Sequence, residues 1–330
     1  GAGKTSLLEA VYLLSHGRSF RSGTRDALVQ RGATAMHVYG ELRGVDSHLH
    51  RLGLGREGAR WQIRVDGSTA PSLGDLVRRC AVVCFEPGSH ALIAGPADER
   101  RRFLDWGVFH VEPEFLTVWR RYQRALKQRN ALLRAERVAA DEQYLPWEQE
   151  LGVAGEQIDA FRQDYLDAFR PRLQEVAQGL LPELGALTLG YRRGWDPEHS
   201  LADLLAATRG RDMARGHTTL GAHRADWSPA FVAAPQREHL SRGQEKLCAL
   251  ACVLAQAGLY AQQHGEWPVV CLDDLASELD QQHQHAVVDQ LVGDGAQVLV
   301  TGTEPVAAFA NHPTTLFHVE QGVVRPAAQP

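Results

Sequence analysis

The sequence predicts an α/β fold whose chain is interrupted by a helical insertion, and three observations lead to this prediction. The first residues, GAGKTSLLEAVYLL, join a glycine-rich turn to a segment with helical spacing of leucines. The run VVCLDD at 269–274 is short, apolar and typical of a buried parallel strand. Between these segments, residues 97–213 have mainly helical periodicity. We therefore expect one lobe made of residues 1–96 with 214–330, and a helical insertion lobe of residues 97–213.

The remaining elements follow from local pattern. Residues 36–66 alternate between apolar and polar side chains with glycine turns, which predicts short antiparallel strands. CAVVCFEP at 80–87 reads as a buried strand ended by proline. Two helical stretches, 97–137 and 147–179, predict a helical hairpin. A helix over 243–263, the strand 269–272, a further helix, the strand AQVLVTG and terminal strands near TLFHVEQGVV complete the chain.

Composition restricts the class of protein. The 330 residues are 44% hydrophobic and 23% charged, as in ordinary globular proteins, and the net charge is −5. This charge argues against a wholly basic nucleic-acid coat but leaves room for a local basic face. With no signal-peptide pattern and no long apolar run, we expect a cytoplasmic protein. The five cysteines lack zinc spacing and are expected to be buried, reduced thiols.

The first five residues resemble the end of a phosphate-binding loop, G-x-x-x-x-G-K-[ST]. Gly1, Ala2 and Gly3 would present backbone N–H groups to a nucleotide. Lys4 would reach the β- and γ-phosphates, and the Thr5 hydroxyl would bind Mg²⁺. A glycine-rich helix start is the alternative. Because the first glycine of the pattern and its supporting strand would precede residue 1, we expect part of this loop to be absent and ATP binding by this chain to be weak.

VVCLDDLASELD delivers two carboxylates to the end of a buried strand, the edge at which parallel sheets bind ligands. Asp273 would hold Mg²⁺, and Asp274 would orient or activate an attacking water. An aspartate-rich turn that caps a strand is the alternative for this segment alone.

The segment HLSRGQEKL opens a long helix rich in leucine and alanine. Ser241, Gly243 and Gln244 would present hydrogen-bond donors at its positive end, where a phosphate could bind. A capping box formed by Ser241 and Gln244 is the alternative, although it requires neither Gly243 nor the long helix.

In combination, GxGKT, LSxGQ, four apolar residues before two acids, and SELD resemble an ABC-type ATPase head. That resemblance implies ATP bound between two protomers, with Ser241, Gly243 and Gln244 acting on the partner's nucleotide and 277–280 crossing the interface. Further blocks, GRSFR, RRFLD, LKQRNALL, GAHRADW and LSRGQEKL, are similar to the RecF family of bacterial recombination mediators over nearly the whole chain. Members of that family begin with strands and a complete loop.

The RecF resemblance implies an ATP- and Mg²⁺-dependent homodimer that binds gapped or damaged duplex DNA. It also implies work with RecR and RecO to load RecA on single strands in replication, DNA damage repair and the SOS response, with weak DNA-dependent ATPase activity. Two features depart from expectation: the Q-loop residue has only Glu86 as a candidate, and Thr301 and Thr303 stand near the place of the switch histidine of transporters. The alternatives are an SMC or Rad50 head, a transporter subunit, and a non-hydrolysing DNA scaffold.

The first half of the insertion is rich in cations and predicts a DNA-binding surface that is not specific for sequence. The candidates are Arg100, Arg101, Arg102, Arg121, Arg124, Lys127 and Arg129, with Arg120, Arg134 and Arg137 nearby. A solvated helix face is the alternative. His223, Arg224 and Asp226 in GAHRADW predict a structural or nucleotide-responsive role near the junction of the lobes rather than a catalytic triad, because no nucleophile with a placed base accompanies them.

Overall fold

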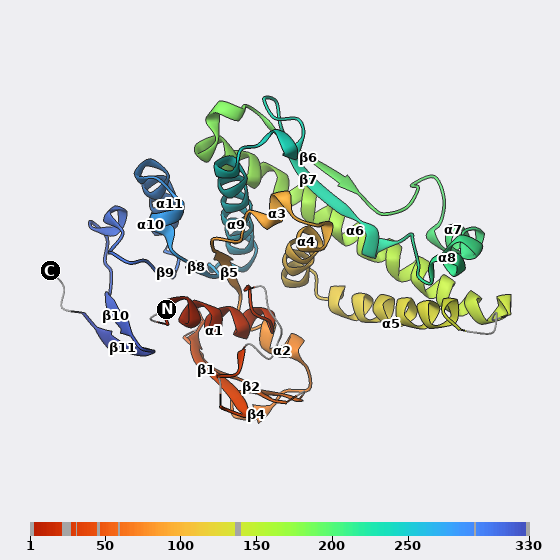
Figure 1. Cartoon of the computed structure of the whole chain (residues 1–330), viewed down its shortest axis with the longest axis horizontal. Helices are drawn as coiled ribbons and strands as arrows, with labels where there is room; N and C mark the ends of the chain where they lie inside the picture. The colour runs from red at the N-terminus through yellow and green to blue at the C-terminus, as the bar shows by residue number, and fades with distance from the viewer. Residues whose placement is uncertain are drawn as a thin grey trace. The chain divides into compact units, whose positions relative to one another are not determined.

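The computed structural model describes residues 3–21, 28–30, 32–44, 47–58, 60–135, 140–293 and 295–327. They form two compact units, one made of residues 1–89 and 249–330 and the other of residues 90–248 (Figure 1). The first is called the sheet unit below and the second the helical unit. Among the described residues, no helix has the length and apolar character needed to cross a bilayer.

The sheet unit contains a three-stranded parallel sheet in the order β5-β8-β9. Its strands are β5 (Val82–Phe85), β8 (Val269–Leu272) and β9 (Val298–Val300). Each strand is a short apolar run with β-branched residues, as expected for strands buried on both faces. The sequence prediction of three strands at these places is confirmed.

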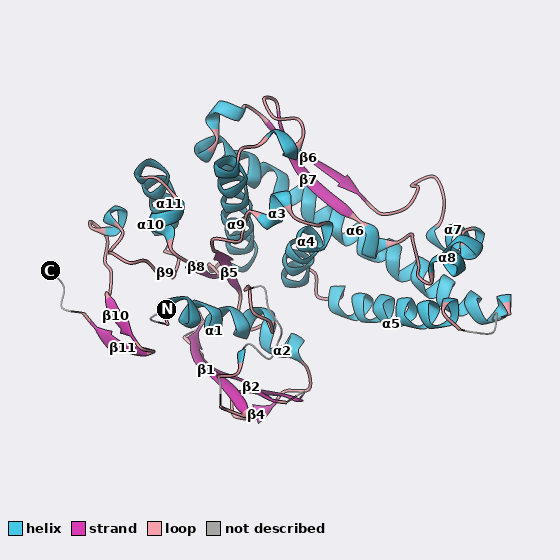
Figure 2. Ribbon diagram, viewed as in Figure 1, coloured by secondary structure: helices cyan, strands magenta, loops and turns pink. Residues whose placement is uncertain are grey.

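A second, antiparallel sheet in the same unit has the order β1-β2-β3-β4 (Figure 2). Its strands are β1 (Ala35–Arg43), β2 (Leu49–Glu57), β3 (Arg60–Val65) and β4 (Ser68–Thr69), followed by α2 (Leu73–Val77). The hairpin of β10 (Phe317–Glu320) and β11 (Val323–Pro326) ends the unit. Two helices, α10 (Leu275–Glu278) and α11 (Gln281–Gly293), follow β8.

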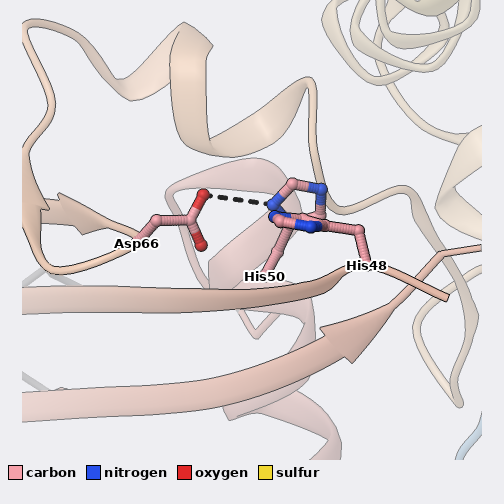
Figure 3. Close-up of side chains that lie close together, drawn as sticks. All are labelled: His48, His50 and Asp66. Atoms are coloured by element: carbon pink, nitrogen blue, oxygen red, sulfur yellow. Dashed lines mark hydrogen bonds and ion pairs between the residues drawn. The ribbon is translucent and has the colours of Figure 1, made fainter. Parts of the chain in front are cut away.

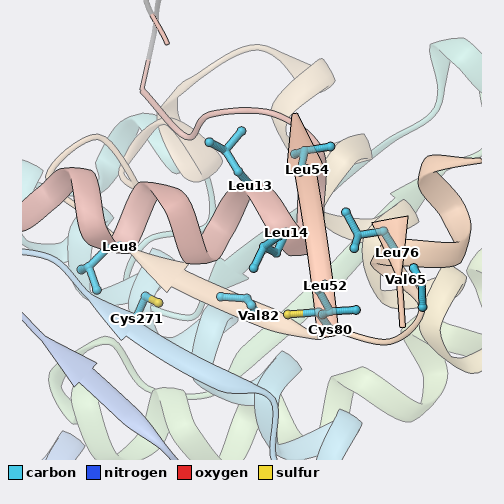
Figure 4. Packing of buried hydrophobic residues seen from close by; sticks show 10 residues of the cluster. All are labelled: Leu8, Leu13, Leu14, Leu52, Leu54, Val65, Leu76, Cys80, Val82 and Cys271. Atoms are coloured by element: carbon cyan, nitrogen blue, oxygen red, sulfur yellow. The ribbon is translucent and has the colours of Figure 1, made fainter. Parts of the chain in front are cut away.

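Helix α1 (Lys4–His16) fills the core of the sheet unit with one face. Leu8, Leu13 and Leu14 pack with Leu52 and Leu54 of β2 and with Val82 of β5 (Figure 4). Gly17 ends the helix in the left-handed conformation, with its N–H on the Leu13 carbonyl at 2.9 Å. This packing fixes the start of α1 relative to the parallel sheet.

The cysteines contribute to the same core. All five are free; four are buried and Cys84 is half-buried. Burial raises the pKa of Cys80 to about 12, and burial followed by the nearby Cys80 raises that of Cys271 to about 12. The expectation of buried, reduced thiols is therefore confirmed for four cysteines, whereas Cys84 is free but only half-buried.

The helical unit is built on the antiparallel pair α5 (Phe115–Leu133) and α6 (Asp141–Leu180), which lie side by side (Figure 1). It also contains α3 (Ala91–Ala94), α4 (Ala97–Val111), α7 (Leu201–Ala207), α8 (Arg209–Arg215), and the ribbon of β6 (Leu187–Arg192) with β7 (Asp226–Phe231). Helix α9 (Arg242–His264) crosses the boundary between the units.

The predicted hairpin exists with different boundaries. Within the predicted stretch 97–137, the described residues form two helices, because Pro113 has no N–H and holds Glu112 in an extended conformation. The other predicted helical stretch, 147–179, lies within α6, which is 40 residues long and continues through Pro146 and Pro171. Its buried stripe, which includes Tyr144 and Leu173, outweighs the hydrogen bonds that the prolines remove.

The structure also places the second boundary between units later than residue 213. Residues 214–248 group with the helical unit. The reason is the β6–β7 pairing, in which Leu187 lies opposite Phe231 and Arg192 opposite Asp226. Sequence periodicity does not reveal a strand partner that lies 34 to 44 residues away.

Candidate functional site

The carboxyl edge of the β5-β8-β9 sheet gathers polar residues from three strands. Phe85 lies opposite Leu272, and Leu272 lies opposite Val300. The next residues, Glu86, Asp273 and Thr301, are therefore at the same level of the edge. This is the place at which open parallel sheets bind ligands.

Asp273 is held firmly at this edge. It is 4% exposed, and its amide N–H donates to the Phe85 carbonyl at 2.8 Å. The Thr301 hydroxyl donates to Asp273 Oδ1 at 2.5 Å and accepts from the Asp274 N–H at 3.1 Å. One threonine hydroxyl thus binds both the Asp273 carboxylate and the backbone of Asp274.

Asp274 adopts the left-handed conformation, with φ 56° and ψ 38°. Ser277 stabilises the turn, because its N–H and its hydroxyl each donate to the Asp274 carbonyl at 3.0 Å. Non-glycine residues in this region of φ/ψ space are uncommon and concentrate at functional sites. The backbone therefore turns the Asp274 side chain away from the direction that a continuing strand would give it.

The N-terminus of α1 lies beside this edge. Gly3 caps the helix with φ 104°, a conformation that favours glycine. The Lys4 ammonium donates to the carbonyl of Gly302, the residue after Thr301, at 2.6 Å. Thr5 follows in the first turn and is half-buried. Gly1 and Ala2, which the sequence assigns to the same loop, lie outside the described residues.

The donor set fits a magnesium nucleotide. Thr5 offers a hydroxyl oxygen and Asp273 a carboxylate, the ligand types that Mg²⁺ prefers. Lys4 supplies a positive charge on the same edge as the two aspartates. The structure thus brings together Lys4, Asp273 and Asp274, which are about 270 residues apart in sequence.

Glu86 is turned toward its own loop. Its carboxylate accepts from the Gly88 N–H at 2.6 Å, and its N–H donates to the Ser89 hydroxyl at 2.9 Å. The carboxylate therefore closes the turn after β5, and this contact gives no support to a Q-loop role. Thr301, in contrast, organises the site, although the sequence pattern marks it only as the residue near a missing histidine.

The LSxGQ segment lies in the helical unit and forms a capping box. The Gln244 N–H donates to the Ser241 hydroxyl at 3.3 Å, and the Ser241 N–H donates to Gln244 Oε1 at 3.0 Å. The Gln244 amide also donates to Glu183 at 3.2 Å. The capping alternative is therefore present in the protein and accounts for Ser241 and Gln244.

Gly243 is not explained by the cap. A Cβ at this position would meet no atom of the described part of the chain within 4 Å, and its φ is not positive. Neither packing nor backbone conformation within one protomer requires glycine here, and glycine weakens a helix. Close approach of another molecule is the remaining physical reason for it.

Two of the cations expected on a DNA surface are in the interior, so the prediction for them is corrected. The Arg100 side chain is 3% exposed and forms a bidentate pair with Asp226, with Nε–Oδ1 at 2.7 Å and Nη2–Oδ2 at 3.1 Å. Arg129 is fully buried and contacts Glu148, Asp212 and Thr218. Buried charges of this kind are paired by charges of the fold itself.

The other five cations lie at or near the surface in two groups. Arg101, Arg102 and Arg121 form ion pairs with Asp98, Glu99 and Glu150. Arg124 and Lys127 are exposed, as is Arg120. On α5 these last three stand at positions i, i+4 and i+7, opposite the buried face that contains Val118, Tyr122 and Ala125.

His223 is a structural residue of the helical unit. Its Nδ1 lies 2.7 Å from the Tyr122 hydroxyl, and its Nε2 lies 3.1 Å from the Thr218 carbonyl. Because a carbonyl only accepts, Nε2 carries the proton and Nδ1 accepts from Tyr122. Burial lowers the pKa of His223 to about 4, so the ring is neutral at physiological pH.

Asp226 completes the same motif. Burial alone would raise the pKa of its carboxyl group, but the hydrogen bonds and charge of Arg100 outweigh this and lower it. The neighbouring Trp227 indole donates to the Arg100 carbonyl at 2.7 Å. In GAHRADW, His223, Asp226 and Trp227 therefore form hydrogen bonds and an ion pair that connect elements inside the helical unit.

Comparison with known proteins defines the class. Residues 1–325 match the family model described as RecF/RecN/SMC N terminal domain. The computed structure superposes on a solved structure of the recombination mediator protein RecF with ATP, with a TM-score of 0.88, 24% identity and coverage of 99% of this chain and 89% of that one. An Smc head domain from Pyrococcus furiosus gives a TM-score of 0.54 at 16% identity, covering 99% and 87%. The predicted ABC-type ATPase fold is confirmed.

Relatives of higher sequence identity show which family within this class the chain belongs to. A protein from Xanthomonas euvesicatoria named DNA replication and repair protein RecF is 50% identical over 336 residues, covering 99% of this chain and 91% of the relative. A protein of the same name from Pseudomonas paraeruginosa is 40% identical over 329 residues, covering 98% and 89%. The chain belongs to the RecF family.

Proposed function

We propose that this chain is a cytoplasmic, ATP-dependent DNA-binding protein of recombinational repair and replication restart. It dimerises on ATP at gapped duplex DNA and, with RecR and RecO, helps load RecA on single strands. Family membership supports this function, as do relatives named for DNA replication and repair and a related structure solved with ATP. The observation that carries the proposal is the Asp273–Thr301–Asp274 cluster with Lys4 on the same sheet edge.

In the sheet unit, Lys4 would exchange its contact with the Gly302 carbonyl for the β- and γ-phosphates of ATP. Thr5 and Asp273 would hold Mg²⁺, which neutralises phosphate charge when it is bound. Asp274 would orient the attacking water and accept its proton. Weak hydrolysis is expected, since the residue near the usual histidine position is Thr301, whose hydroxyl is already engaged by both aspartates.

The helical unit would supply the second half of the site to a partner protomer. The Ser241 hydroxyl, the backbone around Gly243 and the Gln244 side chain stand at the start of α9, where the helix dipole favours an anion. The open space around Gly243 leaves room for a phosphate of the partner's nucleotide. Closure of the dimer by ATP would then be the working step, and hydrolysis would reset it.

The DNA surface would include the exposed stripe of α5. Among the described residues, no ion pair engages Arg120, Arg124 or Lys127, so their charges are available to phosphates. The paired residues Arg101, Arg102 and Arg121 would contribute less, because each already faces a carboxylate.

The experiment is a titration of a gapped duplex with the protein, with and without ATP, over a range of salt. Replacing Arg124 and Lys127 by glutamate should weaken binding at least about 10-fold and reduce the salt slope by about 2. The matched control changes Arg60 and Arg64, exposed residues of β3 in the sheet unit, in the same way and should leave DNA binding intact.

The outcomes separate the alternative functions. Binding that strengthens with ATP supports the proposed ATP-dependent role. Equal binding with and without ATP would favour a DNA scaffold that does not hydrolyse ATP. ATP binding and dimerisation without any DNA binding would favour a transporter-type or other ABC subunit. A large loss of DNA affinity in the control variant, with none in the α5 variant, would place the DNA-binding surface on the sheet unit.

A further inference from the structure

A cluster of metal-ligating side chains lies in the sheet unit, on the antiparallel sheet and apart from the nucleotide residues in sequence. His48, His50 and Asp66 each offer one ligand atom, and these atoms all lie within 4.8 Å of one another. Figure 3 shows both imidazoles and the carboxylate gathered on one side of the sheet. The proposed ATP-binding and DNA-binding roles use none of the three residues.

The sheet itself assembles this cluster. His48 precedes β2 and His50 is its second residue, so the two side chains are separated by a spacing of two and project from the same face. Their rings are 4.6 Å apart between centroids. Asp66 comes from the β3–β4 turn, and strand pairing of Val65 with Leu52 brings it to the same end of β2.

Backbone hydrogen bonds hold the carboxylate in place. Asp66 adopts a left-handed conformation with φ 52°, and its N–H donates to the Arg51 carbonyl at 2.8 Å. The Arg51 N–H donates to Asp66 Oδ1 at 2.8 Å. This leaves Oδ2 facing His50 Nδ1 at 3.1 Å.

The distances suit a small divalent ion. Zinc binds imidazole nitrogen and carboxylate oxygen at about 2.0–2.2 Å, and a tetrahedral arrangement places such ligand atoms about 3.3 Å apart. The His50–Asp66 separation of 3.1 Å is close to this value, so an ion could replace the shared proton with little movement. The ligand atom of His48 lies within 4.8 Å of the other two, close enough to complete the set.

We propose that His48, His50 and Asp66 form a binding site for Zn²⁺ or a similar transition-metal ion on the antiparallel sheet. Two imidazoles and one carboxylate favour such an ion over Mg²⁺, which prefers oxygen ligands and an octahedral shell. A water would take the fourth position. The ion would join the start of β2 to the β3–β4 turn.

The test is a calorimetric titration of the tag-free protein with Zn²⁺ in buffer that contains excess Mg²⁺ to occupy the oxygen-ligand sites. Wild-type protein should bind one equivalent with a dissociation constant of about 10 µM or lower. The variants are His48→Gln, His50→Gln and Asp66→Asn. Asparagine tolerates the left-handed conformation and still accepts from the Arg51 N–H, so the turn is kept.

Each variant should lose at least about 100-fold in zinc affinity, because one of three ligands is removed. The matched control is His283→Gln. His283 forms a similar exposed pair with Asp280, at 2.8 Å, and the described residues place no third ligand beside that pair. The control should bind zinc as the wild type does. Absence of tight binding in the wild type, unchanged affinity in the three variants, or an equal loss in the control would each overturn the proposal.

Discussion

Arg129 offers the sharpest test of how much a buried, paired arginine contributes to the stability of the helical unit. Its side chain is fully buried, and Nε donates to Glu148 at 3.1 Å. The other nitrogens donate to Asp212 at 2.7 Å, to Thr218 at 2.9 Å and to the Leu205 carbonyl at 2.9 Å. We predict that Arg129→Met, which keeps an unbranched stem but removes the guanidinium group, destabilises this unit severely.

The magnitude follows from the carboxylates that remain. Glu148 keeps Arg209, whose Nη2 lies 2.7 Å from Oε2, so most of the cost arises at Asp212. That residue is completely buried, and among the described residues its carboxylate keeps only the neutral Thr219 donors, at 3.2 and 2.6 Å. Removal of one partner from a buried pair costs about 3–5 kcal/mol in the free energy of unfolding.

The assay is denaturant unfolding monitored through hydrogen exchange of the α5 and α6 amides, which reports the free energy of unfolding of the helical unit separately. Adding Asp212→Asn to Arg129→Met should recover at least about 1 kcal/mol, since the uncompensated charge is removed. Arg124→Met, on the exposed face of the same helix, should change stability by less than about 0.5 kcal/mol. A loss below about 1 kcal/mol for Arg129→Met, or no recovery in the double variant, would refute the structural role.

Three further predictions concern other positions. Because the pKa of His223 is about 4 in the folded protein against 6.5 when unfolded, the unfolded state binds the extra proton between these values. The contribution of neutral His223 to the free energy of unfolding of the helical unit should be fully present above about pH 6.5 and should fall by about 3 kcal/mol toward pH 4. Urea titrations at a series of pH values would measure this fall, and His223→Gln should abolish it. Thr301→Val removes the hydroxyl shared by Asp273 and Asp274 and should cost about 1.5–3 kcal/mol in urea unfolding, together with weaker ATP binding measured by calorimetry; an unchanged ATP affinity would count against the site. Gly17→Ala places a Cβ at φ 61° and 2.1 Å from Leu73 Cδ2, and it should lower the free energy of unfolding of the sheet unit by about 1–2 kcal/mol, as a thermal melt would reveal.

Local sequence pattern predicts those helices and strands whose hydrophobic spacing and flanking residues can be recognised within a few positions. VVCL is apolar, β-branched and followed by two acids, and it becomes β8 with the aspartates at the sheet edge. The leucines after Lys4 become the buried face of α1. The parallel sheet then brings Lys4 to the aspartates, as the motif order predicts.

Contacts between distant segments were beyond reach of the same reasoning. Arg100 and Arg129 read as surface cations because their partners, Asp226 and Asp212, lie 126 and 83 residues further on. Pro146 reads as a helix boundary because the buried stripe of α6 that overrides it is visible only after packing. The His48–His50–Asp66 cluster depends on strand register, which places Asp66 beside residues 16 positions earlier.

The central claim is that ATP bound at the β5-β8-β9 edge is completed by Gly243 of a second protomer. The most direct measurement is the protomer mass of the protein with and without ATP, for the wild type and for Gly243→Glu. A Cβ added at Gly243, in the first turn of α9, meets no atom of the described residues within 4 Å. A glutamate there also favours the helix N-terminus, but it would repel a partner's phosphate. At an ATP concentration that saturates the nucleotide site, we expect wild-type protein to double its mass of 36.4 kDa, and the variant to remain monomeric while unfolding no earlier than the wild type. Equal ATP-driven dimerisation of both proteins, or no dimer with ATP bound, would contradict the account.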